Sequence, residues 1–220
     1  MSQQQRSDTV GRVEACGVVA VIRLQDSSKL RAVVDALAAG GVKALEVTMT
    51  VPRAIELIGQ IAPTLPPGFV IGTGTIIDAD TAQAAILAGA RFVVGPVFRP
   101  AVIEMCHRHG AAAMPGCFSP TEILTAWEAG ADVVKVFPAT ALGPSYFKDI
   151  RGPLPQLKLM PTGGVTLDNA GDWIRAGAVA IGVGTALVDA ALVAAGDFAA
   201  ITGRAGRFVD AVRAARGRAS

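Results

Sequence analysis

The chain has 220 residues, of which 51% are hydrophobic and 5% aromatic, and its formal net charge at pH 7 is +2. This length suits one domain with an aliphatic core, and so small a net charge gives no reason to expect a nucleic-acid partner. The three cysteines, Cys16, Cys106 and Cys117, lie far apart without a CxxC pair, which argues against a disulfide framework and against a zinc site.

Short apolar runs alternate with helical patterns along the chain. A polar leading helix is predicted at residues 2–16, followed by a strand at 17–22 that is apolar throughout. Seven further strands are predicted at 44–48, 70–72, 92–95, 112–115, 133–137, 157–160 and 178–182. Helices are predicted at 28–39, 52–61, 78–88, 100–109, 119–129, 145–150 and 168–176, then from 185 and at 197–215.

Eight strands, each followed by a helix, predict an α/β fold of the (β/α)₈ TIM-barrel type. We expect a single domain over residues 1–220. Residues 1–16 would form the leading helix that covers one end, residues 17–196 the barrel, and residues 197–220 a C-terminal helix. A doubly wound open sheet is the alternative, but that fold usually has fewer strands and a glycine-rich first turn.

Nothing in the sequence predicts a membrane segment or a signal peptide. The uncharged run from Leu57 to Ile77 is long enough to span a bilayer, but it contains Pro63, Pro66 and Pro67. The apolar run at 15–22 is short and lacks a clean cleavage site. We therefore expect a cytoplasmic protein without a membrane partner.

Two charged residues, Glu46 and Lys135, interrupt otherwise apolar strands. Side-chain alternation turns both of them into the barrel lumen, near the strand ends where TIM barrels carry their sites. Burial lowers the pKa of an amine, and a neutral lysine is a nucleophile that forms Schiff bases with ketones. A neighbouring carboxylate would move the protons. The alternatives are a buried structural ion pair and a lysine that reaches solvent.

Glycine-rich segments end the last two predicted strands, at 161–165 and 182–185. In this architecture the corner formed by those strands commonly binds phosphate through backbone amides and a helix N-terminus. His107 and His109 stand two apart on a predicted helix and face different ways, so we predict no metal there and no metal-dependent aldol chemistry.

Four segments, at 45–48, 72–75, 135–139 and 161–165, together resemble the 2-keto-3-deoxy-6-phosphogluconate (KDPG) aldolases. They read LEVT, GTGT, KVFPA and PTGGV, and the similarity runs in order from about residue 17 to the last helices. That family includes 4-hydroxy-2-oxoglutarate (KHG) aldolases and 6-phosphogalactonate relatives. The resemblance implies a homotrimeric class I aldolase without a metal or other cofactor, which cleaves its sugar-acid phosphate to pyruvate and glyceraldehyde 3-phosphate.

The resemblance also implies roles for individual residues. Lys135 would form the Schiff base and Glu46 would transfer protons. The expected substrate pocket contains Arg23, Thr50, Thr75, Pro96, Phe137 and Thr162, and the expected phosphate site contains Gly163, Gly164, Gly184 and Thr185. The family often has serine where Thr185 stands.

One position departs from the family pattern. Well-known members carry an arginine for the substrate carboxylate where this chain has Thr50, whereas some relatives have an arginine at the position of Arg23. We therefore hypothesise that Arg23 supplies that cation. Three alternatives remain: a preference for the 6-phosphogalactonate epimer, a phosphosugar epimerase or isomerase on the same barrel, and a barrel that binds a ligand without catalysis.

Overall fold

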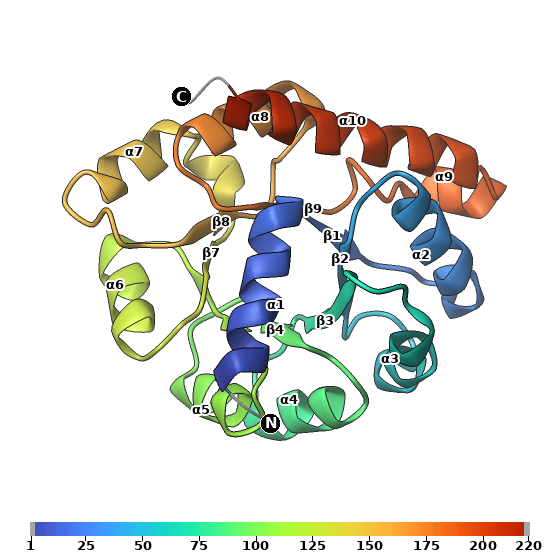
Figure 1. Cartoon of the computed structure of the whole chain (residues 1–220), viewed down its shortest axis with the longest axis horizontal. Helices are drawn as coiled ribbons and strands as arrows, with labels where there is room; N and C mark the ends of the chain where they lie inside the picture. The colour runs from blue at the N-terminus through green and yellow to red at the C-terminus, as the bar shows by residue number, and fades with distance from the viewer. Residues whose placement is uncertain (1–2, 218–220) are drawn as a thin grey trace.

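The structure is a computed structural model that describes residues 3–217, with a ring of strands surrounded by helices (Figure 1). The strands are β1 (Val18–Ile22), β2 (Ala44–Thr48), β3 (Val70–Gly74), β4 (Phe92–Val94), β5 (Ala112–Met114), β6 (Gly116–Cys117), β7 (Val134–Val136), β8 (Leu159–Pro161) and β9 (Ile181–Val183). The α-helices are α1 (Gln3–Cys16), α2 (Leu30–Ala39), α3 (Ala54–Ile61), α4 (Ala79–Leu87), α5 (Pro100–Arg108), α6 (Pro120–Glu128), α7 (Ser145–Arg151), α8 (Leu167–Arg175), α9 (Ala190–Ala195) and α10 (Phe198–Gly217). Short 3₁₀ turns lie at η1 (Ser27–Lys29), η2 (Ala62–Thr64) and η3 (Ala139–Ala141).

The strands are parallel and follow one another around the barrel. One sheet has the order β5-β4-β3-β2-β1-β9 and the other β6-β7-β8, while two isolated bridges, Leu159 to Ala178 and Thr162 to Gly182, join β8 to β9. β5 and β6 are consecutive and separated only by Pro115, whose carbonyl accepts a hydrogen bond from the Lys135 amide at 2.9 Å. They are therefore two halves of one barrel strand, and the predicted TIM barrel is confirmed.

Several predicted boundaries were wrong. The single strand predicted at 112–115 is divided because Pro115 has no N–H to continue the ladder. The last two strands begin later than predicted, at Leu159 and Ile181. No helix starts at residue 185, since α9 begins at Ala190, where the Asp189 carboxylate accepts from the backbone N–H groups of residues 191 and 192. Residues 1, 2 and 218–220 of the predicted terminal helices lie outside the described residues.

Apolar side chains fill the part of the lumen near the N-terminal ends of the strands, and α1 closes this end of the barrel, as predicted. Val10 and Val13 of α1 belong to the same buried cluster as ten residues of the barrel: Val19, Ala44, Val70, Phe92, Val94, Ala112, Met114, Val133, Met160 and Ala180. Figure 1 shows α1 lying across the ring. The N-terminal end of the lumen is thus sealed against water.

Hydrogen bonds and ion pairs hold α1 in place. Arg216 of α10 donates to the carbonyls of Ala15 and Val179 at 3.1 and 3.0 Å, so a cation satisfies the C-terminal end of α1. Arg6 pairs with Asp132 at 3.1 Å. The last helix of the chain therefore fixes the first one against the barrel.

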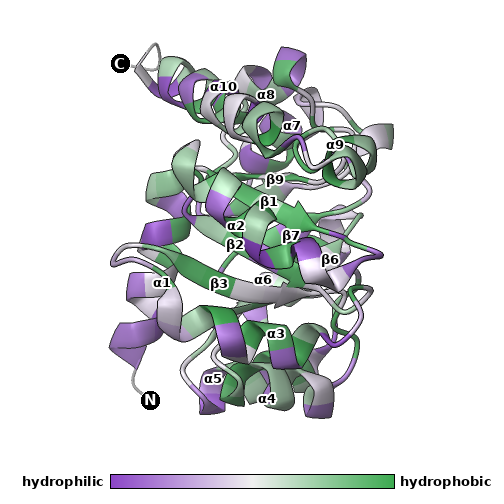
Figure 2. Cartoon of the chain, turned by 90° about the vertical axis from the view of Figure 1, so that its right-hand side faces the viewer, coloured by the Kyte–Doolittle hydropathy of each residue, from purple (hydrophilic) through white to green (hydrophobic). Residues whose placement is uncertain are grey.

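A larger apolar layer lies between the strands and the outer helices, and Figure 2 shows hydrophobic strands between helices with hydrophilic outer residues. α10 buries five side chains at alternating spacings of four and three: Ile201, Ala205, Phe208, Val212 and Ala215. This spacing gives one helical stripe, which packs on α2 and α8. Between residues 3 and 217, no helix is both long and apolar enough to cross a bilayer.

Candidate active site

Lys135 and Glu46 face each other from opposite sides of the barrel. Lys135 is the middle residue of β7 and Glu46 the middle residue of β2, and three barrel strands separate β2 from β7 in either direction. The two residues are only 2% and 1% exposed. Both lie above the apolar cluster that fills the N-terminal part of the lumen, as side-chain alternation predicted.

Burial shifts both groups toward their neutral forms. It lowers the pKa of the Lys135 amine; the charge of Glu46 opposes this shift, and the charge of Arg23 adds to it. Burial likewise raises the pKa of the Glu46 carboxyl, while the positive charges of Lys135 and Arg23 oppose that rise. A greater fraction of Lys135 is therefore a free amine at neutral pH than for an exposed lysine, and Glu46 can bind and release a proton closer to neutrality.

The ring of Phe137 packs beside the amine. The Lys135 Nζ atom lies 4.8 Å from the ring centroid. An aromatic face attracts a cation at this distance and excludes water from it. The ring is therefore placed to favour the positive charge that an iminium ion at this nitrogen would carry.

The Glu46 carboxylate depends on a neighbouring glycine that the sequence analysis did not assign to the site. A Cβ on Gly74 would overlap Oε1 of Glu46 and lie 2.6 Å from its Cδ, so only glycine fits there. Neither carboxylate oxygen has a hydrogen-bond partner within residues 3–217. Both remain available to a substrate. The alternation of Gly72 and Gly74 on the lumen face of β3 was the signal that could have identified this position.

Seven of the predicted residues line one small hollow of about 80 Å³ at the C-terminal ends of the strands. They are Arg23, Phe137, Thr162, Gly163, Gly164, Gly184 and Thr185. The Thr162 hydroxyl is buried without a hydrogen-bond partner in the described part of the chain, and a Cβ on Gly182 would overlap it. An unpaired buried hydroxyl that lines a hollow is a group ready to bind a ligand.

Gly163, Gly164, Gly184 and Thr185 form a corner of this hollow, here called the anion corner, because its backbone has the geometry of an anion site. Gly163 and Gly164 take φ values of +88° and +73° and lead within three residues to the N-terminus of α8. The exposed Arg23 faces the same hollow, and its Nη1 lies 3.8 Å from where a Cβ on Gly184 would be. The hollow is thus lined by the Arg23 guanidinium and by the glycine backbone that leads into the N-terminus of α8.

The other three predicted pocket residues lie outside this hollow. Thr75 directly follows β3 and has a φ of +64°, a conformation that non-glycine residues rarely adopt and that is often found at functional sites. Pro96 contacts the backbone of Gly116, whose Cβ would overlap the Pro96 carbonyl. Thr50 is exposed, and its hydroxyl shares a 2.6 Å hydrogen bond with that of Thr48.

The arrangement provides the groups for imine chemistry on a ketone that carries an anionic group. It has a desolvated amine, a carboxyl group with a raised pKa, an aromatic face and an anion corner. Across residues 3–217, no group of three or more His, Cys, Asp or Glu side chains converges as metal ligands do.

Comparison with known proteins identifies the family. The model of the family described as "Aldolase: KDPG and KHG aldolase" matches residues 11–203. The 2-dehydro-3-deoxy-phosphogluconate aldolase of Treponema pallidum is 36% identical over 89% of this chain and 91% of its own length. The probable 2-dehydro-3-deoxy-6-phosphogalactonate aldolase of Rhizobium meliloti is 38% identical over 77% of this chain and 81% of its own.

A solved structure shares the fold closely. The KDPG aldolase of Legionella pneumophila, determined with pyruvate captured as a covalent carbinolamine, superposes with a TM-score of 0.83 at 28% identity, and covers 90% of this chain and 96% of that one. The family match spans most of the barrel, including Glu46 and Lys135. The chain therefore belongs to the KDPG and KHG aldolase family and is an aldehyde-lyase.

Proposed function

We propose that the chain cleaves KDPG to pyruvate and glyceraldehyde 3-phosphate through a Schiff base on Lys135. The observation that carries this proposal is the pairing of a buried amine of lowered pKa with a buried carboxyl of raised pKa across one lumen. The Legionella relative, in which pyruvate forms a covalent carbinolamine, supports the same type of intermediate here. A phosphosugar epimerase would have no use for a desolvated lysine at this position.

In the proposed reaction the free Lys135 amine attacks the C2 ketone to form a carbinolamine. The protonated Glu46 carboxyl gives its proton to the carbinolamine hydroxyl, which leaves as water, so that a protonated imine and a Glu46 carboxylate remain. Glu46 then removes the proton of the C4 hydroxyl. The electrons of the C3–C4 bond flow to the iminium nitrogen, so that the aldehyde leaves and an enamine remains. Glu46 returns the proton to C3, which gives the protonated imine of pyruvate. Water then hydrolyses this imine to release pyruvate and the neutral amine, and the proton set free returns to Glu46.

The anion corner supports a phosphorylated substrate. Gly163, Gly164, Gly184 and Thr185 lie in the hollow that Phe137 also lines, so a chain anchored at Lys135 can extend toward them. We infer that the 6-phosphate binds there and that kcat/KM is higher for KDPG than for KHG. The 6-phosphogalactonate epimer is the second candidate, because a relative with that name is as similar as those named for the gluconate form.

Replacing Arg23 by glutamine is expected to raise the KM for pyruvate in the aldol direction by roughly tenfold to a hundredfold, since a charge-assisted hydrogen bond to the carboxylate is lost. It should also move the pH profile. Arg23 lowers the pKa of both Lys135 and Glu46, so its removal raises both values and shifts both limbs of the profile to higher pH. Initial rates for KDPG, its C4 epimer and KHG, measured from pH 5 to 10 with both enzymes, test the substrate and Arg23 together.

The same measurement separates two roles for this arginine. If Arg23→Gln leaves the KM for pyruvate unchanged and raises that for glyceraldehyde 3-phosphate, Arg23 binds the phosphate and the carboxylate assignment is wrong. Arg207→Gln is the matched control, since Arg207 is exposed on α10 and makes no hydrogen bond or ion pair with the described residues.

We further propose that the chain assembles as a homotrimer, as the family resemblance implies. Three large apolar side chains, Ile77, Val97 and Phe118, are 56%, 46% and 41% exposed and lie on the loops that follow β3, β4 and β6. These strands are neighbours in the barrel, so the loops form one apolar rim at the C-terminal end. A rim of this kind is typical of a surface that a partner covers.

The double variant Ile77→Glu/Val97→Glu is expected to dissociate the trimer, because it places charges in a surface that would otherwise be buried. Light scattering after gel filtration should change from about three times the 22.4 kDa chain mass to a single chain. Leu87→Glu is the control, since Leu87 is 69% exposed but lies at the end of α4, away from the rim. A trimer that tolerates the double variant would rule out this rim as the interface.

A further inference from the structure

A second and larger cavity lies at the N-terminal end of the barrel. It is a groove of about 650 Å³ between α1 and the segment that runs from η2 into β3. Val70, the first residue of β3, and Arg91, which precedes β4, lie at its base. Lys135 and Glu46 point toward the other end of the strands. The volume is within the range of small-molecule sites, and the groove has no part in the aldolase reaction.

One wall of the groove is apolar and stiff. Leu65, Pro66 and Phe69 line it, within a stretch that has prolines at positions 63, 66 and 67. Proline fixes the backbone, so this wall is formed in advance and loses little entropy when a ligand binds. An apolar body of a ligand can lie against it.

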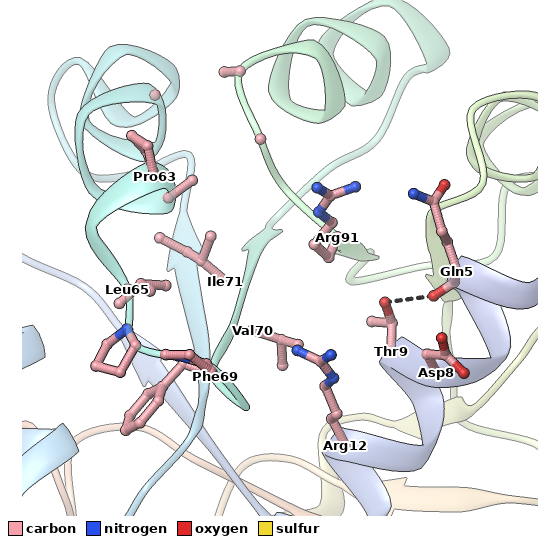
Figure 3. A pocket seen from close by; sticks show the side chains of 16 residues that line it. Gln5, Asp8, Thr9, Arg12, Pro63, Leu65, Phe69, Val70, Ile71 and Arg91 are labelled. Carbon is pink, nitrogen blue, oxygen red and sulfur yellow. Dashed lines mark hydrogen bonds between the residues drawn. The ribbon is translucent and has the colours of Figure 1, made fainter. Parts of the chain in front are cut away.

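The base and the opposite side of the groove together carry a surplus of positive charge. Arg12 of α1 and Arg91 both extend into the groove, whereas Asp8 is the single acidic residue that lines it (Figure 3). Asp8 accepts a 2.8 Å hydrogen bond from Gln4 of the same helix and does not pair with Arg12. Arg12 makes no hydrogen bond or ion pair with any residue from 3 to 217. Its guanidinium is therefore available to an anion from solution.

From this combination we propose that the groove is a binding site for a small organic anion, a molecule with one acidic group on an apolar body. The acidic group pairs with Arg12 beside Arg91, and the body lies on Leu65, Pro66 and Phe69. The site is separate from the aldolase centre because the two open at opposite ends of the barrel. Its ligand thus contacts α1, the helix that closes the lumen.

The test uses two fluorescent probes with the same apolar body, 8-anilinonaphthalene-1-sulfonate and the uncharged N-phenyl-1-naphthylamine, titrated into the full-length protein. The sulfonate is expected to bind saturably at one site per chain and at least tenfold more tightly than the uncharged probe. Arg12→Gln should weaken sulfonate binding at least tenfold, since it removes a charge-assisted hydrogen bond, and should leave the uncharged probe unaffected. Equal binding of the two probes, or no effect of Arg12→Gln, would overturn the proposal.

Two further variants locate the binding and control for folding. Gly59 lines the groove from α3, and a Cβ there would make only ordinary contacts, 3.7 and 3.9 Å from atoms of Ala88. Gly59→Glu therefore fits the helix, places a carboxylate in the groove and should abolish sulfonate binding. Arg207→Gln, the exposed arginine on α10, should bind as the wild type does. All three variants should keep the wild-type kcat/KM, so loss of binding reports on the groove whether or not the substrate is assigned correctly.

Discussion

Replacing Lys135 by methionine is expected to reduce kcat/KM roughly 10⁴-fold or more, because the covalent route disappears and only binding of the substrate remains. Methionine has nearly the volume of lysine, so the apolar surroundings of this 2% exposed side chain stay filled. Incubation with pyruvate and borohydride should add the mass of a reduced pyruvyl group to the wild type and nothing to the variant. Lys43→Met is the control, since Lys43 is exposed just before β2, and it should keep both the adduct and the activity.

The pH dependence of trapping in the wild type gives a second test of the same amine. Burial lowers the pKa of Lys135 below its ordinary value of 10.5, so the rate of adduct formation should fall only when the pH drops through that lowered value. A midpoint near 10.5 would mean that the amine is solvated in the working enzyme. An adduct on another lysine would show that Lys135 is not the nucleophile.

Gly74→Ala is expected to lower kcat by about 10²- to 10⁴-fold, although Gly74 has no chemistry of its own. The new methyl group would overlap the Glu46 carboxylate and force it away from the lysine, so general acid–base catalysis is lost. Overpacking at this buried position should also cost about 1–3 kcal/mol of folding stability. Steady-state kinetics and urea unfolding measure the two effects.

Two companion variants separate the causes. Glu46→Gln keeps the shape but cannot accept the proton, and it should show the same loss in kcat without the steric cost. Gly203→Ala, in α10 with no atom within 4 Å of its new Cβ, should retain activity and gain about 0.5–1 kcal/mol in stability. Wild-type kcat in Gly74→Ala would refute the role assigned to Glu46.

The central pair of the site was predictable because it depends on a regular pattern. Strand alternation is enough to turn Glu46 and Lys135 into the same lumen once a barrel is assumed. The anion corner follows in the same way from the strand ends. The role of Arg23 toward the carboxylate was a hypothesis from resemblance. Alternation alone does not predict that its side chain enters the hollow, because this residue lies beyond the last residue of β1.

Other features depend on packing that the sequence pattern does not contain. The sequence pattern predicts that a strand ends at Pro115, yet the barrel strand continues past it because Gly116 and Cys117 pair with β7. The left-handed backbone of Thr75 is imposed by tertiary contacts, since threonine does not favour it. The backbone conformation of a loop likewise determines which of its side chains turn outward, as Val97 does, and the residue types of the loop do not reveal it. The groove beside Arg12 arises only when α1 meets the proline-rich segment.

The seal that α1 places under the barrel also bears on the acidity of the reaction centre. Val10 and Val13 are 6% and 0% exposed and lie in α1, where they form the floor of the apolar cluster beneath the amine. In a chain shortened to begin at Gly17, water would reach that layer, and the pKa of Lys135 would rise toward its ordinary value. Helix α1, at the opposite end of the barrel from the hollow, thus helps to set the pH range in which the Lys135 amine can react.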